Sequence, residues 1–177
     1  NSLKFSKEKV SLQPINLSKS TLTELQNNLL LFREGNTRNS STILTNQIDM
    51  IKKKNPDTLT SLLTVKDLAF DMHKSLKQSD ITKFGELIHQ GWLAKKKFAK
   101  NVTNSRIDKI YDVALKNGAI GGKVTGAGGG GHMLFYCEKL KQKKLQKKLQ
   151  TLGLEHVKFS FYNNGPKIVK TSDMSNF

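Results

Sequence analysis

Glycines are concentrated in one stretch of the chain, and that stretch is the first candidate for chemistry. Eight of the 13 glycines lie between Gly118 and Gly131, and residues 121–131 read GGKVTGAGGGG. Glycine allows positive φ angles and a close approach of the backbone to a ligand, and successive N–H groups in such a turn can converge on an anion. The stretch therefore predicts a phosphate-binding loop.

Two standard nucleotide motifs do not describe this loop. Gly126, Gly128 and Gly131 satisfy G-x-G-x-x-G, but that fingerprint requires a helix after the loop, and the apolar run His132–Cys137 predicts a strand. A P-loop requires a Lys and a Ser or Thr where this chain has His132 and Met133. The remaining alternative is a structural turn between antiparallel strands. Four consecutive glycines favour a functional loop.

Three basic residues are candidates for holding a substrate phosphate. Arg38 follows Gly35, near the end of an apolar run, where a guanidinium could clamp a phosphate at two points. Lys97 ends the run Lys95–Lys97 at a predicted helix end, and Arg106 lies just inside a helix start. Simpler interpretations stay open, since surface arginines are usually solvated and last-turn lysines complement the helix dipole.

The surrounding elements are predicted from apolar periodicity. Short apolar or alternating runs predict strands at Val10–Leu17, Leu29–Phe32, His132–Cys137 and His156–Tyr162. Helices are predicted from Ser40, after Pro56, from Asp80, from Ser105 to a closing Gly118, and over Leu140–Leu152. Strands at both ends around a helical middle indicate an α+β domain with a mostly antiparallel sheet.

Apolar residues at helical spacing mark these helices. The apolar positions of the first two helices are Leu44, Ile48, Ile51, Leu59, Leu62, Leu63, Ala69, Met72 and Leu76. His89 and Trp92 share an apolar face, which favours packing over ligation, and no metal site is predicted. The lysines of Leu140–Leu152 are interpreted as a solvated helix face first and a nucleic-acid patch second.

Composition limits the class of protein. A length of 177 residues suits one domain, and no apolar run is long enough for a membrane helix. The single cysteine, Cys137, predicts a buried, inert thiol and fits a reducing cytoplasm. The net charge of +16 suits an anionic partner, so a basic nucleic-acid-binding module is the alternative function. Aromatic residues at 7%, not interleaved with basic ones, weaken that alternative.

A resemblance to a known family rests on the glycine stretch and its surroundings. The string KVTGAGGGG, Lys123–Gly131, followed by the apolar run HMLFYC, resembles the third conserved motif of the GHMP kinases, a superfamily of galactose, homoserine, mevalonate and phosphomevalonate kinases. Residues 29–38 (LLLFREGNTR), Gly91-Trp92 with Lys95–Lys97, and residues 104–109 resemble its heptose 7-phosphate kinase branch. The similarity covers nearly the whole chain.

The resemblance implies a fold and a division of labour. The fold implied is α+β: a ferredoxin-like, four-stranded antiparallel sheet with helices on one face and extra inserted helices. Residues 1–177 are expected to form the C-terminal domain, with 1–17 as a tail of the upstream domain. The family's ATP-binding domain, with its nucleotide loop and catalytic base, is expected upstream of Asn1, which makes this chain an inactive fragment with no catalytic residue of its own.

The resemblance also implies ligands and partners. The complete enzyme would use ATP and Mg2+ to phosphorylate heptose 7-phosphate or a related sugar phosphate in the cytoplasm, with the N-terminal domain as partner, no membrane, and nucleic acid disfavoured. The loop placed beside the transferred phosphate comprises Thr125, Gly126, Ala127, Gly128, Gly129, Gly130 and Gly131. Its implied role is positioning and charge stabilisation.

Overall fold

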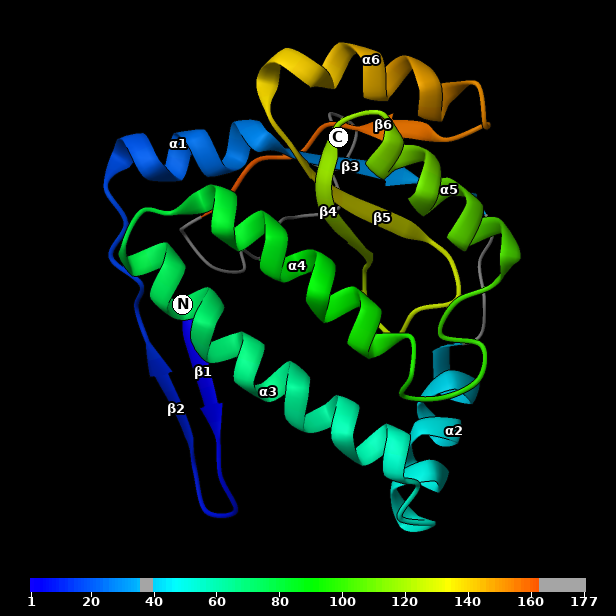
Figure 1. The fold of residues 1–177 in the computed structure, drawn as a ribbon. Coiled ribbons are helices and arrows are strands. Elements are labelled where there is room, and N and C mark those ends of the chain that lie inside the picture. The colour runs from blue at the N-terminus through cyan, green and yellow to red at the C-terminus, as the bar shows by residue number, and fades with distance from the viewer. Residues whose placement is uncertain (36–39, 163–177) are drawn as a thin grey trace, which may run out of the picture.

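A computed structural model describes residues 1–35 and 40–162, and it contains helices and strands in the order expected of an α+β domain (Figure 1). The elements are β1 Ser2–Phe5, β2 Val10–Gln13, α1 Lys19–Asn28, β3 Leu29–Arg33, α2 Ser40–Lys52, α3 Pro56–Lys77, α4 Ile81–Lys95, α5 Ser105–Lys116, β4 Ala119–Val124, β5 His132–Cys137, α6 Lys139–Gln150 and β6 Glu155–Val157.

The centre of the fold is a four-stranded antiparallel sheet in the order β4-β5-β3-β6. Helices α5 and α6 cover one face, where Phe32 and Phe135 are fully buried with Leu145 and Leu149 of α6. Helix α4 packs on the other face, against Tyr136. The α+β class and the four-stranded antiparallel sheet are confirmed, whereas helices cover both faces of the sheet and not one face as expected, because α4 packs on Tyr136.

Helix α4 approaches β4 closely because both contribute glycines. A Cβ atom added to Gly121 would lie 2.1 Å from the carbonyl oxygen of Gly85 and 2.8 Å from the amide nitrogen of His89. A Cβ atom added to Gly85 would lie 2.5 Å from the ring of Tyr136. Neither contact is possible for a real side chain, so both glycines are required for the helix to lie on the sheet at this distance.

A hydrogen-bonded pair ties α4 to α5 beside this contact. The Tyr111 hydroxyl donates to the carbonyl oxygen of Gly122 (3.2 Å) and lies 2.8 Å from Nδ1 of His89, whose ring stacks on that of Tyr111. A hydroxyl has one hydrogen, so His89 is the donor to Tyr111 in this arrangement. Burial raises the pKa of Tyr111 well above its ordinary value. His89 therefore has a packing role, as its apolar helix face predicted.

Several helix ends lie where local sequence signals predicted them. Asp80 caps α4 through the amide of Lys83, and Asn55 caps α3 with Pro56 in its first turn. Asn104 caps the start of α5 by accepting a hydrogen bond from the amide of Ile107. Gly118, with a φ of 107°, follows the end of this helix. These caps act locally, which is why the sequence alone could place them.

Other elements differ from the sequence predictions. The strand predicted over Val10–Leu17 ends at Gln13, because Pro14 has no N–H to donate to a ladder. The final strand stops at Val157, and the amide of Phe161 donates instead to Oε1 of Gln26 in α1 (2.8 Å). The sequence predictions missed β1, α1 and β4. Cys137 is buried, as predicted, and burial raises its pKa to about 11.

The apolar stripes of α2 and α3 are only partly covered. Ile43 is the buried residue of α2, whereas Leu44, Ile48 and Ile51 are exposed. Helix α2 lies at the edge of the molecule and packs mainly on α3, where Leu63 is also exposed. The predicted helices are therefore confirmed. Part of their apolar stripes faces the surface of this chain, while Leu62, Met72 and Leu76 pack against the core.

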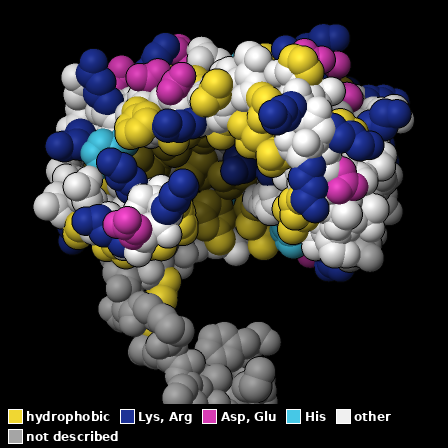
Figure 2. Space-filling view, turned by 90° about the horizontal axis from the view of Figure 1, so that it is seen from below, with side chains coloured by type: hydrophobic (Ala, Val, Ile, Leu, Met, Phe, Trp, Pro, Cys, Tyr) yellow, Lys and Arg dark blue, Asp and Glu magenta, His cyan; other side chains and the backbone are white. Residues whose placement is uncertain are grey.

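The N-terminal hairpin formed by β1 and β2 extends away from the sheet (Figure 1). It makes few contacts with the rest of the described chain, and Leu3, Phe5, Val10 and Leu12 are all more than half exposed. Seen from the side of the hairpin and α2, the surface is hollowed and lined with hydrophobic side chains, with Lys and Arg around it (Figure 2). Across the described ranges, no helix is long and apolar enough to span a bilayer.

Two phenylalanines test how the hairpin relates to the core. Phe5 is 72% exposed and Phe32 is fully buried. We expect Phe5→Ser to change the free energy of unfolding by less than about 0.5 kcal/mol, and Phe32→Ala to lower it by about 3–5 kcal/mol. Urea denaturation followed by circular dichroism measures both. A loss above about 1 kcal/mol for Phe5→Ser would mean that the hairpin is part of the folded core.

The glycine contact between α4 and β4 has a matched control within α4. Gly121→Ala should lower the free energy of unfolding by about 1–3 kcal/mol, because its Cβ would overlap the Gly85 carbonyl. Gly91→Ala should raise it by about 0.4–1 kcal/mol, because its Cβ meets only the end of Met72 at 3.7 Å. Urea denaturation compares them, and equal effects of the two substitutions would contradict the proposed close approach.

Candidate functional site

The glycine loop, residues 125–131, connects β4 to β5 at one end of the sheet. Its conformation requires glycine, since Gly126, Gly128, Gly129, Gly130 and Gly131 all have positive φ angles, between 66° and 153°. The loop closes through the amide of Thr125, which donates to the carbonyl oxygen of His132 (2.9 Å). The predicted turn between antiparallel strands is therefore present, and its function depends on what surrounds it.

The connection between α4 and α5 holds the middle of the loop. The amide of Gly129 donates to the carbonyl oxygen of Val102 (2.8 Å), and Nδ2 of Asn104 lies 3.5 Å from the carbonyl oxygen of Gly129. A Cβ atom at Gly128 would lie 2.6 Å from the same Val102 oxygen. Gly128 is therefore required twice, for its φ of 112° and for this contact.

The two ends of the loop are held by α4 and β3. Nζ of Lys95, in the last turn of α4, donates to the carbonyl oxygen of Gly126. At the other end, the amide of Glu34 donates to the carbonyl oxygen of Gly131 (2.8 Å). Segments from α4, the α4–α5 connection and β3 thus fix a loop that its own sequence would leave flexible.

This anchoring leaves loop amides free to bind a ligand. Within residues 1–35 and 40–162, the amides of Gly126, Gly128 and Gly130 donate to no protein group. A Cβ atom at Gly126 or Gly131 would meet nothing within 4 Å, so one side of the loop is open. Fixed, unpaired N–H groups beside open space form a suitable site for an anion such as a phosphoryl group.

The predicted basic residues are placed differently relative to this loop. Arg106 donates through Nε to Oε1 of Glu34 (2.6 Å) and through Nη2 to the carbonyl oxygen of Leu152 (3.3 Å). Because Glu34 also holds Gly131, Arg106 is linked to the loop through an ion pair. Lys97 is exposed just beyond α4. Arg38 lies outside the described residues.

Sequence reasoning did not identify the groups that anchor the loop. Val102 acts through its carbonyl oxygen and Glu34 partly through its amide, so no side-chain pattern could reveal them. Asn104 carried a local signal as an N-cap, but its approach to Gly129 depends on the tertiary fold. Lys95 was a candidate only as one of three consecutive lysines at a helix end.

The electrostatics of Lys95 distinguish it from its neighbours. Partial burial, followed by the charge of Lys123 on β4, lowers its pKa from 10.5 to about 8. Lys96 instead pairs with Oδ1 of Asp108 (3.1 Å), which also accepts from the hydroxyl of Thr103 (2.9 Å). Lys95 therefore differs from Lys96, because it lies beside another lysine instead of a carboxylate.

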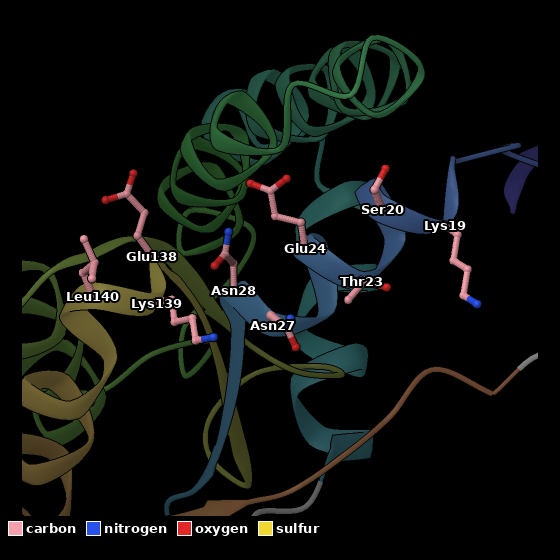
Figure 3. Close-up of a pocket in the computed structure, with 9 residues that line it drawn as sticks. All are labelled: Lys19, Ser20, Thr23, Glu24, Asn27, Asn28, Glu138, Lys139 and Leu140. Atoms are coloured by element: carbon pink, nitrogen blue, oxygen red, sulfur yellow. The ribbon is translucent and has the colours of Figure 1, made fainter.

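A separate cavity of about 820 Å3 lies between α1 and the start of α6 (Figure 3). It adjoins the carboxyl end of β5, whereas the loop adjoins the amino end of that strand. Its side chains do not converge, since Glu24 and Glu138 point one way and Lys19 and Lys139 the other. The glycine loop is therefore the better candidate site.

Comparisons with known proteins agree on one family. Residues 72–153 match the family described as GHMP kinases C terminal. The chain is 27% identical over 163 residues to the D-glycero-alpha-D-manno-heptose 7-phosphate kinase of Campylobacter jejuni, covering 92% of this chain and 48% of that relative. The chain thus spans about half the length of this curated relative.

Solved structures share the fold. L. major mevalonate kinase in complex with R-mevalonate matches with a TM-score of 0.68 at 16% identity, covering 84% of this chain and 44% of that one. A D-glycero-D-manno-heptose 1-phosphate kinase from Bacteroides thetaiotaomicron matches with a TM-score of 0.60 at 22% identity, covering 92% and 43%. Residues 72–153 thus match the C-terminal family of the GHMP kinases, and the chain shares its fold with solved kinase structures.

Proposed function

We propose that this chain is the substrate-side domain of an ATP-dependent kinase that transfers a phosphoryl group to a sugar phosphate, heptose 7-phosphate or a close relative. The observation that carries the proposal is the anchored glycine loop, which has free amides, open space beside Gly126 and Gly131, and a lysine, Lys95, bonded to it. The similarity to a heptose 7-phosphate kinase supports the substrate class.

The loop suits phosphoryl transfer for a physical reason. Transfer depends on holding the donor and acceptor in line and on stabilising the charge of the moving group. Amides fixed before the substrate arrives stabilise that charge without reorganising during the reaction. Residues Thr125 to Gly131 would thus position the transferred group, with Arg106, Lys97 and Arg38 as further candidates for the acceptor's phosphate.

The proposal assigns ATP binding and the catalytic base to a domain upstream of this chain. The exposed hairpin and the exposed apolar residues of α2 and α3 support a partner on that side of the molecule, and we assign residues 1–17 to the upstream domain. Among the described residues, no group of three or more His, Cys, Asp or Glu side chains could hold Mg2+. We assign the metal's protein ligands to the same upstream domain, and this chain alone is expected to be inactive.

Two finer points belong to the same proposal. The strand order β4-β5-β3-β6, with helices in both connections that flank the β4–β5 pair, supports a ferredoxin-like arrangement. The buried, unpaired thiol of Cys137 is compatible with a cytoplasmic enzyme.

The kinase proposal is tested by assaying ATP-dependent phosphorylation of sugars and sugar phosphates. The chain alone and the chain joined to its native upstream region are compared on the same panel. We expect turnover only from the longer protein, with heptose 7-phosphate among the best acceptors. Silence on every acceptor, with tight and salt-sensitive binding of random DNA, would favour the basic nucleic-acid-binding module.

A loop substitution tests whether the glycine turn takes part in transfer. In the longer protein, Gly128→Val should lower kcat/KM by about 100-fold or more, because the side chain displaces the loop from Val102. Gly91→Ala, in α4 but away from the loop, should leave the rate unchanged. Circular dichroism verifies that both variants are folded, and normal activity of a folded Gly128→Val protein would contradict a role for the loop.

A further inference from the structure

Lys95 and Lys123 lie on the same side of the glycine loop. Lys123 pairs with Leu134 in the β4–β5 ladder, on the face where Gly121 contacts α4. Helix α4 runs along this face toward the loop, and Lys95 is in its last turn. The two side chains therefore come from the two elements that the close glycine contact brings together.

Neither lysine is neutralised by a carboxylate. The five ion pairs of the described chain involve Arg33–Glu155, Lys83–Glu86, Lys96–Asp108, Arg106–Glu34 and Lys141–Glu138. Lys95 and Lys123 are both half-buried. The hydrogen-bond partner of Lys95 is the neutral carbonyl of Gly126, on the loop and not in the last turn of α4. Lys95 therefore does not hydrogen-bond the carbonyl groups at the end of its own helix.

The uncompensated, half-buried ammonium group of Lys95 is unfavourable in the free protein. Desolvation of Lys95 and the like charge of Lys123 both disfavour its protonated form and lower its pKa to about 8. A bound anion would reverse both effects, because it supplies the missing negative charge. A bound anion would thus stabilise the charge of Lys95, which its bond to the neutral Gly126 carbonyl does not neutralise.

We propose that Lys95 and Lys123 form a binding pair for a phosphoryl group at the α4 side of the glycine loop. An ammonium group has three donors, so Lys95 can keep its bond to Gly126 and still donate to a phosphoryl oxygen. The free loop amides would complete the site. This inference rests on the proposed function for its biological role, but the binding itself can be measured without catalysis.

Other charged groups near Lys95 are accounted for. On α4, Lys96 is paired with Asp108 of α5; at the end of β3, Glu34 is paired with Arg106 of α5. His132 begins β5 beside the loop. His89 of α4 is hydrogen-bonded to Tyr111. After burial, the charge of Lys123 is the second cause of the lowered pKa of Lys95.

Sulfate is the probe for this site, because it is a tetrahedral dianion that does not itself titrate near neutral pH. It is titrated into the 15N-labelled chain at pH 7 in about 0.15 M NaCl, which screens the exposed lysines. We expect the amides of Gly126, Gly128 and Gly130 to shift along one binding curve. Lys95→Met and Lys123→Met should each weaken binding about tenfold. Lys100→Met, which removes an exposed charge nearby, is the matched control and should bind like the parent chain.

The pH dependence separates charge from shape. Anion binding favours protonated Lys95, so sulfate affinity should be nearly flat from pH 7 to about 8 and fall at higher pH by about tenfold in total. Lys95→Arg keeps its charge and should lose this fall between pH 8 and 9. If a His132→Gln variant shows the same fall in sulfate affinity, the fall comes from Lys95 and not from His132. Two results would contradict the proposed binding pair. One is a set of amide chemical-shift changes spread over α6 with none in the loop, and the other is equal sulfate affinity of Lys95→Met and Lys100→Met.

The longer protein identifies which phosphoryl group the pair binds. If Lys95→Met raises KM for the sugar phosphate and spares turnover of unphosphorylated sugar, the pair holds the acceptor's own phosphate. If kcat falls for both acceptors, the pair acts on the transferred group. Sulfate binding by a protein without kinase activity would refute the proposed function alone, and kinase activity without loop-specific sulfate binding would refute the pair alone.

Discussion

The contact between α4 and β4 is the constraint on which the candidate site depends. Gly85 and Gly121 remove two Cβ atoms from the interface, so the helix lies directly on the strand. Helix α4 and strand β4 therefore both run toward the glycine loop (Figure 1). The last turn of α4 reaches the loop, where Lys95 bonds Gly126. A larger residue at either glycine would lift the helix and withdraw Lys95 from Gly126.

The loop itself shows how a flexible sequence becomes a rigid site. Glycines lose more backbone entropy on ordering than other residues, so five positive φ angles in seven residues are unfavourable in isolation. Hydrogen bonds between the loop and Val102, Lys95 and Glu34 offset this loss of backbone entropy. They use mainly loop carbonyls and one central amide, which leaves other amides for a ligand. Rigidity and binding capacity thus come from different atoms of the same segment.

The fold could be predicted from sequence wherever the signal was local. Asp80 and Pro56 mark helix starts by their own chemistry, and Gly118 marks the end of α5. The predictions failed where a neighbour decides the outcome. The alternating run from His156 is paired with β3 only as far as Val157. The apolar spacing of Leu44 predicts a helix but does not show whether a neighbour covers it, and Leu44 is exposed because α2 lies at the edge of the domain.

The sequence by itself determined the glycine loop, the strand after it, and the resemblance of both to one kinase family, because these depend on residue types at fixed spacing. Only the tertiary structure decided how the loop is held and which cations face it. Val102 contributes a backbone oxygen, and Lys95 and Lys123 meet because two glycines distant in sequence allow a helix and a strand to touch. Contacts of that kind depend on distances in space, which residue spacing along the chain does not encode.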